Sequence, residues 1–376
     1  TVAAKDQPYV TLMDGDNEVT EYVGANVTVK AKAGGKTINV TAATMDGTNR
    51  KYTVRIRTAQ LVTDMHVDDQ ILAVGRTVNL ASKLTYNQTA DAQPTNKKVV
   101  WSLDNQTDAL YVNLNASNGS LRALKLPANK ETYTVNITVK AQDGSLVEEK
   151  LAVTLYPATT NLNIMDKDVN VTNKTIKLYV GKMTTEEFRN SCDLNVDIQP
   201  AKAFQNVKWT IAEKDKEFLS IDETTGKVEA LKGGRTVAVT VTAQDGTNMR
   251  STVRIQTVQL MDDMEVINQP AGNEIHVAAG KTMALKINAL PTNTANKNVT
   301  WEVIGGEGAD YVTLTAAGSL KVAQNLPSNM ELFIRATAKD EGGYSEVFKV
   351  TLYKQVTMSI RLTAPTTTLG VGHSMQ

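Results

Sequence analysis

The sequence contains a single cysteine, Cys192, among its 376 residues. One cysteine excludes a disulfide within the chain and excludes a metal cluster built on several thiolates. No apolar run approaches the roughly 18 residues that cross a bilayer, and residues 1–5 lack the basic and apolar regions of an export signal. We therefore expect no transmembrane segment in these residues, and we expect any signal or anchor to lie outside them.

The sequence also lacks an excess of charge of either sign. Lysine and arginine total 40, as do aspartate and glutamate, so no basic field exists to attract nucleic acid or anionic lipid. We expect no nucleic-acid partner. Aromatic residues make up only 5% of the chain, whereas threonine, valine and asparagine are frequent. This composition favours strands and turns over long helices.

The three tryptophans mark a repeat. Trp101, Trp209 and Trp301 are 108 and 92 residues apart, and each follows a short segment that contains valine. Before each tryptophan comes a Gly turn that leads into an alternating strand, and after it comes a Gly-centred hairpin. Because a fixed place in a strand is typical of core residues, we interpret the three tryptophans as structural core rather than as a platform for sugars.

Each repeat closes with two alternating strands joined by a turn that contains Asp and Gly. Such turns occur at Asp46, Asp143, Asp245 and Asp340, at spacings close to 100 residues. An Asp-Gly turn between alternating runs is a strong hairpin signal, and about seven short strands per hundred residues indicate a β-sandwich. We predict an all-β tandem array of immunoglobulin-like domains at residues 1–58 (a C-terminal half), 59–156, 157–257, 258–354 and 355–376 (the start of a further domain).

A longer periodicity lies above this one. The segment Gly34-Gly35-Lys36-Thr37 recurs as Gly233-Gly234-Arg235-Thr236, an offset of 199, and Trp101 recurs as Trp301, an offset of 200. Since each offset spans two domains, we predict that the repeating unit is a pair, type A followed by type B. The chain then begins and ends inside domains and is a window on a longer array.

The order of these signals resembles the bacterial immunoglobulin-like group 2 domain. Residues 292–302, Thr-Asn-Thr-Ala-Asn-Lys-Asn-Val-Thr-Trp-Glu, are the most similar stretch, and the resemblance covers nearly the whole chain. Vertebrate-type immunoglobulin domains commonly carry a disulfide between their sheets, so the near absence of cysteine also favours a bacterial or viral array. The resemblance implies an extracellular location, on a bacterial cell surface or a virion, but it implies no particular activity.

Acidic residues gather where the predicted domains meet. Because calcium prefers oxygen ligands, these residues are candidates for calcium binding between domains, although no spacing matches a known calcium loop and solvated linker charges explain them equally well. We expect no other cofactor. The candidates are Asp64, Asp68 and Asp69, Asp166 and Asp168, and Asp262, Asp263 and Glu265.

Other reactive residues do not form a recognisable active site. The histidines, His66, His276 and His373, are scattered, with no nucleophile and carboxylate placed around any of them. Cys192 is more simply a small buried residue than a reactive thiol. Several Asn-x-Ser/Thr sequences occur, but some lie in predicted strands, which weakens their interpretation as glycan sites. We therefore predict that the chain is not an enzyme.

Three hypotheses for function follow. In the first, the chain is a repeat-built rod of a bacterial surface layer, sheath or filament, and it associates with itself or with neighbouring surface proteins. In the second, it is the stalk of an adhesin that binds a host or cell-wall ligand, such as a glycan, through a domain outside these residues. In the third, its domains are spacers of a cell-wall enzyme or of a phage virion protein.

Overall fold

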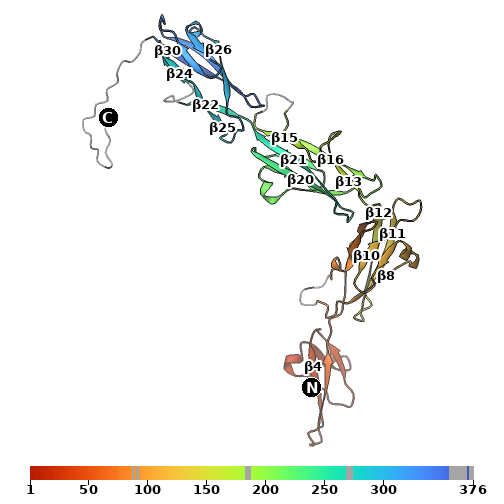
Figure 1. Ribbon diagram of the computed structural model, residues 1–376. Coiled ribbons are helices and arrows are strands. Elements are labelled where there is room, and N and C mark those ends of the chain that lie inside the picture. The colour runs from red at the N-terminus through yellow and green to blue at the C-terminus, as the bar shows by residue number, and fades with distance from the viewer. Residues whose placement is uncertain (87–88, 90–92, 183–187, 268–273, 355–370, 372–376) are drawn as a thin grey trace. The chain divides into compact units, whose positions relative to one another are not determined.

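The computed structural model describes residues 1–86, 89, 93–182, 188–267, 274–354 and 371. Apart from 3-10 helices of three to five residues, the regular structure there is β-strand (Figure 1). The prediction of an all-β chain of tandem immunoglobulin-like sandwiches is confirmed. None of the helices in these ranges is both long and apolar enough to span a membrane. The predicted start of a further domain at residues 355–376 lies outside the described residues, except for Val371.

Contacts group the chain into two compact units. One contains Thr1–Asn163, Val196–Lys208 and Val241–Arg250, and the other contains Ile164–Asn195, Trp209–Thr240 and Ser251–Gln376. Within these units we use the names module 1 to module 4 for residues 1–58, 59–156, 157–257 and 258–354. The boundaries of these ranges stay predictions.

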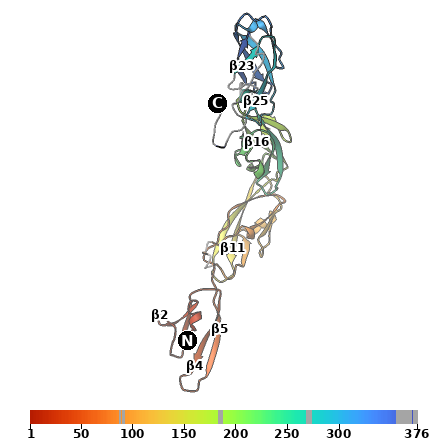
Figure 2. The same ribbon diagram turned by 90° about the vertical axis from the view of Figure 1, so that its left-hand side faces the viewer.

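Module 1 contains two small sheets. Strand β1 (Val10–Asp14) pairs with β2 (Asn17–Val19) and with β3 (Thr28–Ala31), and a helical turn, η1 (Ala4–Asp6), precedes them. Strands β4 (Thr37–Ala43) and β5 (Lys51–Arg57) form a hairpin that Figure 2 shows side by side. A short apolar cluster that includes Val10, Leu12 and Ile38 lies between the two sheets.

Module 2 is a complete sandwich. One sheet has the order β7-β10-β9 and the other the order β6-β12-β11-β8, with β6 parallel to β12. The first strand of the module thus lies at the edge of the sheet that contains its last two strands. A single buried cluster fills the space between the sheets. The elements are β6 (Gln70–Ala73), β7 (Thr77–Asn79), η2 (Leu80–Ser82), β8 (Val99–Leu103), η4 (Gln106–Leu110), β9 (Val112–Leu114), β10 (Ser120–Ala123), β11 (Tyr133–Ala141) and β12 (Glu148–Tyr156).

The strands of module 3 contribute residues to both compact units. They form a sheet of order β14-β13-β16-β19-β18 and a sheet of order β15-β21-β20-β17, with β15 parallel to β21. The elements are β13 (Asn161–Asp166), β14 (Val169–Asn170), β15 (Thr175–Val180), β16 (Ser191–Gln199), β17 (Val207–Thr210), η5 (Glu213–Asp215), β18 (Leu219–Ile221), β19 (Lys227–Ala230), β20 (Arg235–Ala243) and β21 (Arg250–Gln259).

Module 4 repeats the topology of module 2. Its sheets have the orders β24-β28-β27 and β23-β30-β29-β26, with β23 parallel to β30, and β22 pairs with β25. The core again forms one cluster. The elements are β22 (Asp263–Ile267), β23 (Glu274–Ala278), β24 (Thr282–Ala284), β25 (Lys286–Leu290), β26 (Val299–Gly305), η6 (Ala309–Tyr311), β27 (Val312–Leu314), β28 (Ser319–Val322), β29 (Met330–Ala338) and β30 (Ser345–Tyr353).

Each tryptophan packs against a glycine of the following hairpin. Trp101, Trp209 and Trp301 are 1%, 1% and 4% exposed. A Cβ atom on Gly119 would lie 2.8 Å from the ring of Trp101, and the same distance applies to the glycines beside the other two tryptophans, Gly226 and Gly318. All three glycines have positive φ. The hairpin glycine is therefore required twice, by its backbone conformation and by the indole ring that lies on it.

We predict that Gly119→Ala destabilises module 2 by about 2–4 kcal/mol, because a left-handed alanine costs about 1 kcal/mol and overpacking against Trp101 adds about 1–3 kcal/mol. Gly15→Ala is the control: Gly15 has φ of +59° but no atom within 4 Å of the added Cβ, so it should cost only about 1 kcal/mol. Hydrogen exchange of peptides from β10 and β1 measures both losses. Equal losses at the two sites would contradict this role of the tryptophan.

Candidate functional site

The described histidines do not belong to a catalytic group. The Nδ1 atom of His66 lies 3.1 Å from Glu149 and its Nε2 atom lies 3.1 Å from Asp68. Hydrogen bonds to Asp68 and then to Glu149 raise the pKa of His66, but the two carboxylates contact opposite sides of the ring and do not converge on one point. His276 contacts the hydroxyl of Tyr353 at 3.3 Å. His373 lies outside the described residues.

The acidic candidates near the start of module 2 do not come together. Asp64 is exposed. Asp68 contacts His66, whereas Asp69 accepts a hydrogen bond of 2.7 Å from the backbone N–H of Ala152. Each of these three side chains therefore has its own surroundings.

The acidic candidates of modules 3 and 4 are also used separately. Asp166 forms a two-point ion pair with Arg189, and Asp168 is exposed. Asp262 accepts a hydrogen bond from the backbone of Lys182, and Asp263 accepts one from Met264. In the part of the chain that the structure describes, no three His, Cys, Asp or Glu side chains form a group that could hold a metal ion. Calcium between the domains stays a prediction.

Cys192 lies in β16 and is 5% exposed. Burial raises the pKa of its thiol to about 11, and the nearby Arg189 offsets only part of this rise. Since the thiolate is the reactive form of cysteine, this thiol is poorly nucleophilic near neutral pH.

The closing Asp-Gly turns also bond to the first residues of their module, which the hairpin signal did not indicate. In modules 2 and 4 the Oδ2 atom of the turn aspartate accepts a hydrogen bond of 2.6 Å from a backbone N–H near the start of the same module: Asp143 from Val62, and Asp340 from Met261. The Oδ1 atom accepts from the turn itself. The aspartate thus ties the first residues of a module to its last hairpin. We call this contact the aspartate latch.

In module 3 the latch is doubled and buried. Asp245, with no exposed surface, accepts at Oδ2 from both the N–H of Thr159 (2.9 Å) and its hydroxyl (2.6 Å), and at Oδ1 from Thr247. Burial alone would raise the pKa of Asp245, but these hydrogen bonds outweigh it and lower the pKa. The carbonyl of the same residue accepts from the N–H of Ala73, in module 2. The latch therefore also contacts the preceding module.

The step from a type A module to a type B module has the same construction twice. At the first, a Cβ atom on Gly34 would overlap the backbone of Gln60, and the carbonyl of Gln60 accepts from the N–H of Thr95 at 2.9 Å. The hydroxyl of Thr58, which is 2% exposed, bonds the carbonyl of Lys36 at 3.3 Å. The linker is therefore enclosed by a Gly-Gly turn on one side and a loop of the next module on the other.

The second step, in the other compact unit, repeats each contact. Gly233 lies against the backbone of Gln259, and the carbonyl of Gln259 accepts from the N–H of Ala295 at 3.0 Å. The hydroxyl of Thr257, also 2% exposed, bonds the carbonyl of Arg235 at 3.2 Å. We call these two steps the A-to-B junctions. Gln60 and Gln259 are 199 residues apart, which is the offset of the predicted pair of domains. The A and B alternation stays a prediction.

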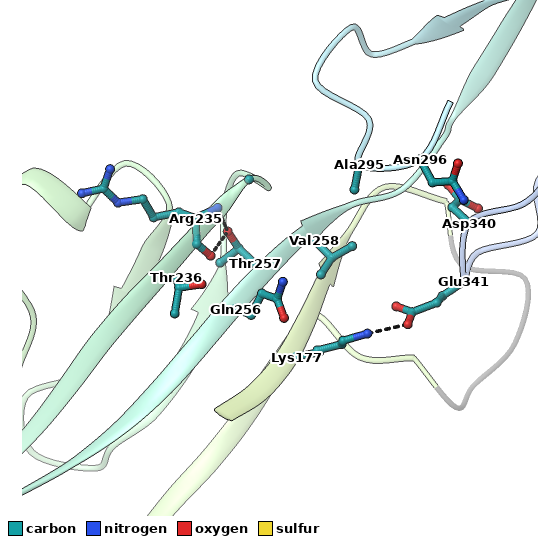
Figure 3. A pocket seen from close by; sticks show the side chains of 11 residues that line it. Lys177, Arg235, Thr236, Gln256, Thr257, Val258, Ala295, Asn296, Asp340 and Glu341 are labelled. Atoms are coloured by element: carbon teal, nitrogen blue, oxygen red, sulfur yellow. Dashed lines mark hydrogen bonds and ion pairs between the residues drawn. The ribbon is translucent and has the colours of Figure 1, made fainter. Parts of the chain in front are cut away.

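A polar hollow of about 440 Å³ lies beside the second A-to-B junction (Figure 3). The ion pair between Lys177 and Glu341, 2.5 Å long, crosses one side of it. Its lining is mostly polar and charged and contains neither cysteine nor histidine. We describe it as part of the junction.

Asp245→Asn should destabilise module 3 by about 1–3 kcal/mol, because an amide cannot accept at both former carboxylate oxygens and leaves a buried donor unsatisfied. The lowered pKa also predicts a pH effect: the stabilisation is present above the ordinary pKa of aspartate, near 4, and is lost as the pH falls through the lower folded value. Urea unfolding between about pH 2.5 and 7 should show this loss in the native protein but not in the variant.

The matched control for this prediction is Asp46→Asn. Asp46 begins the same Asp-Gly-Thr-Asn turn, but it accepts from Thr48 within that turn. Its replacement should cost clearly less than that of Asp245. Equal costs, or a variant at 245 that keeps the native pH dependence, would show that the contact with Thr159 is not the source of the stability.

Comparisons with known proteins do not assign the chain to a family. No protein-family model and no curated protein matches it. Among solved structures, cadherin domains 3–6 of protocadherin gamma B2 are 9% identical over 95% of this chain and 91% of that chain, with a TM-score of 0.33. A protocadherin gamma B7 cis-dimer is 12% identical over 84% and 82%, with a TM-score of 0.32. Mouse cadherin-23 EC22-24 is 12% identical over 77% of this chain and 95% of that chain, with a TM-score of 0.27. Likeness at this level carries no argument about function.

Proposed function

We propose that this chain is a non-catalytic structural protein of a bacterial cell surface, in which tandem sandwiches act as a spacing rod of a surface layer, sheath or filament. The observation that carries the proposal is the repeated A-to-B junction. A linker whose backbone is enclosed on both sides, as at Gln60 and Gln259, has little freedom to bend. Such a step sets the distance between neighbouring modules, and its repetition sets the length of an array.

The bacterial setting is supported by the sequence. The chain resembles the bacterial immunoglobulin-like group 2 domain, and it holds its described sandwiches without a disulfide, since its one cysteine is free and buried. We propose that its partners are further copies of itself or neighbouring surface proteins.

Deleting residues 59–257 tests the spacing role. The deletion joins Thr58 to Val258, which recreates the natural Thr257-Val258 step and connects module 1 to module 4 through an A-to-B junction. Because a sandwich with strands of about 10 residues adds roughly 35–40 Å, the maximum dimension in solution should shorten by about 70–80 Å. Small-angle X-ray scattering at low protein concentration measures this, and electron microscopy of the producing surface should show the same shortening in the layer or fibre.

Deleting residues 59–156 is the control. It removes only module 2 and joins Thr58 to Pro157, so two type A modules meet without the Gln linker. Hydrogen exchange around Gly34 should then rise, whereas it should stay native in the longer deletion. If both deletions left this region equally protected, or if surfaces carrying the protein showed no ordered layer or fibre, the spacing role would be wrong.

A further inference from the structure

Module 4 presents an apolar cluster on the outer face of its four-stranded sheet. Ile304, Phe333 and Val347 are 40%, 43% and 48% exposed. They come from β26, β29 and β30, which are adjacent in the sheet. Phe333 pairs with Gly305, next to Ile304, and Val347 pairs with Arg335, two residues along β29 from Phe333. These side chains are thus same-face neighbours, either across the strands or along a diagonal. We call them the apolar triad.

Strand alternation places Ile304 in this triad. Along β26, Val303 packs on the core, whereas Glu302 and Ile304 are exposed. The pairing of β26 with β29 shifts between Val303 and Gly305, beside Ile304. The irregularity lies next to the triad, and period-two alternation is enough to turn Ile304 outward.

Module 2 has polar residues at the same three places. The strand registers align Ile304 with Asp104, Phe333 with Asn136, and Val347 with Lys150. In module 2, Asp104 accepts from Thr138 at 2.5 Å and pairs with Lys150 at 3.3 Å. The same sheet face therefore folds with a charged network in one type B module and with an apolar cluster in the other, so folding does not require the apolar residues.

The type A modules do not carry the cluster either. The register of β4 and β5 places Asn39 at the position of Phe333, and Thr53, which bonds Thr41, at the position of Val347. In module 3 the corresponding threonines are Thr240 and Thr252, which bond one another at 3.3 Å. Small and polar residues are thus the usual occupants of this face.

Charged pairs of both signs border the triad. Arg335 bonds Glu302 at 3.1 Å, and Lys349 bonds Glu331 at 2.7 Å. Along β26, β29 and β30 these two acids and two bases balance, so each sign is present to meet the other. The fourth strand adds one exposed acid, Glu274, opposite Lys349. An interface related by a two-fold axis uses one patch twice, so the patch must be complementary to itself. A border of mixed charge around an apolar centre meets this requirement.

We propose that the outer face of β26, β29 and β30 binds the same face of a second copy of this chain. The contact buries the apolar triad of each copy against that of the other, and the border acids of one copy face the border bases of its partner. This inference rests on the proposed function and assigns its self-association to one surface. When two chains bind each other through module 4, their other modules are not part of this contact. Those modules then set the distance to any further contact along the array.

The test replaces the apolar triad with the residues of module 2, as Ile304→Asp, Phe333→Asn and Val347→Lys in one chain of residues 1–376. Since module 2 folds with this combination, the variant should fold. Sedimentation equilibrium over about 1–500 µM, a range suited to weak complexes, should show the native chain passing from monomer to dimer. The variant should bind itself at least about 30-fold more weakly.

The matched control makes the same three kinds of change at exposed apolar residues elsewhere in the same compact unit. Ile267→Asp, Leu231→Asn and Val169→Lys replace side chains that are 41%, 50% and 59% exposed. This control should dimerise within about threefold of the native chain. Unfolding of each variant in urea, followed by tryptophan fluorescence, verifies that the folds are kept.

Three results would overturn the proposal: a native chain that stays monomeric at 500 µM, a triad variant that dimerises like the native chain, or a control that loses dimerisation to the same extent. None of these affects the spacing role, because the length of the deletion variants is measured on dilute monomers. Conversely, if the deletion variants contradicted the spacing role, the sedimentation results would still show whether module 4 carries the dimer face.

Discussion

Gly34 and Gly233 lie so close to the backbone of the following linker that no side chain could be placed on them. This close approach sets the path of the chain between a type A and a type B module. The hydrogen bonds of the linker carbonyls at Gln60 and Gln259 depend on that path. The first glycine of the Gly-Gly pair is required because the linker backbone occupies the place of a side chain. The second glycine adopts a positive φ, which glycine tolerates best.

The aspartate latch complements this packing with directional bonds. A carboxylate has two oxygens, and the closing turn uses one of them for its own local fold. The other oxygen is then free to reach the first residues of the module, about 80 positions earlier in the chain. The turn of module 3 also contacts module 2 through Ala73, at the end of strand β6. In module 3 the aspartate latch therefore links the closing hairpin to the preceding module as well.

These contacts explain why a chain without a described metal cluster or a disulfide can still have defined steps between modules. In the described residues these contacts use backbone groups, glycines and one carboxylate in each of modules 2, 3 and 4. The apolar triad of module 4 is an exception to this pattern. The equivalent residues of module 2 are polar, so the sheet does not need apolar side chains at these positions. We therefore assign the apolar triad to binding of a second copy.

Periodicity was sufficient to predict the all-β class and the burial of the three tryptophans. A strand pattern of period two and a turn of Asp and Gly are local properties, and local properties are present in the sequence. The offset of 199 residues likewise marked Gly34 and Gly233 as equivalent. The sequence could not indicate that the second oxygen of Asp245 contacts Thr159, because that contact joins residues far apart in the chain. It also could not indicate that Ile304, Phe333 and Val347 lie together on one outer face, since the pairing register of three strands decides which side chains are neighbours. By itself the sequence therefore determined the repeat and its fold class. Only the tertiary structure decided where the repeats are tied together and which face is left apolar, because both depend on pairing between distant strands.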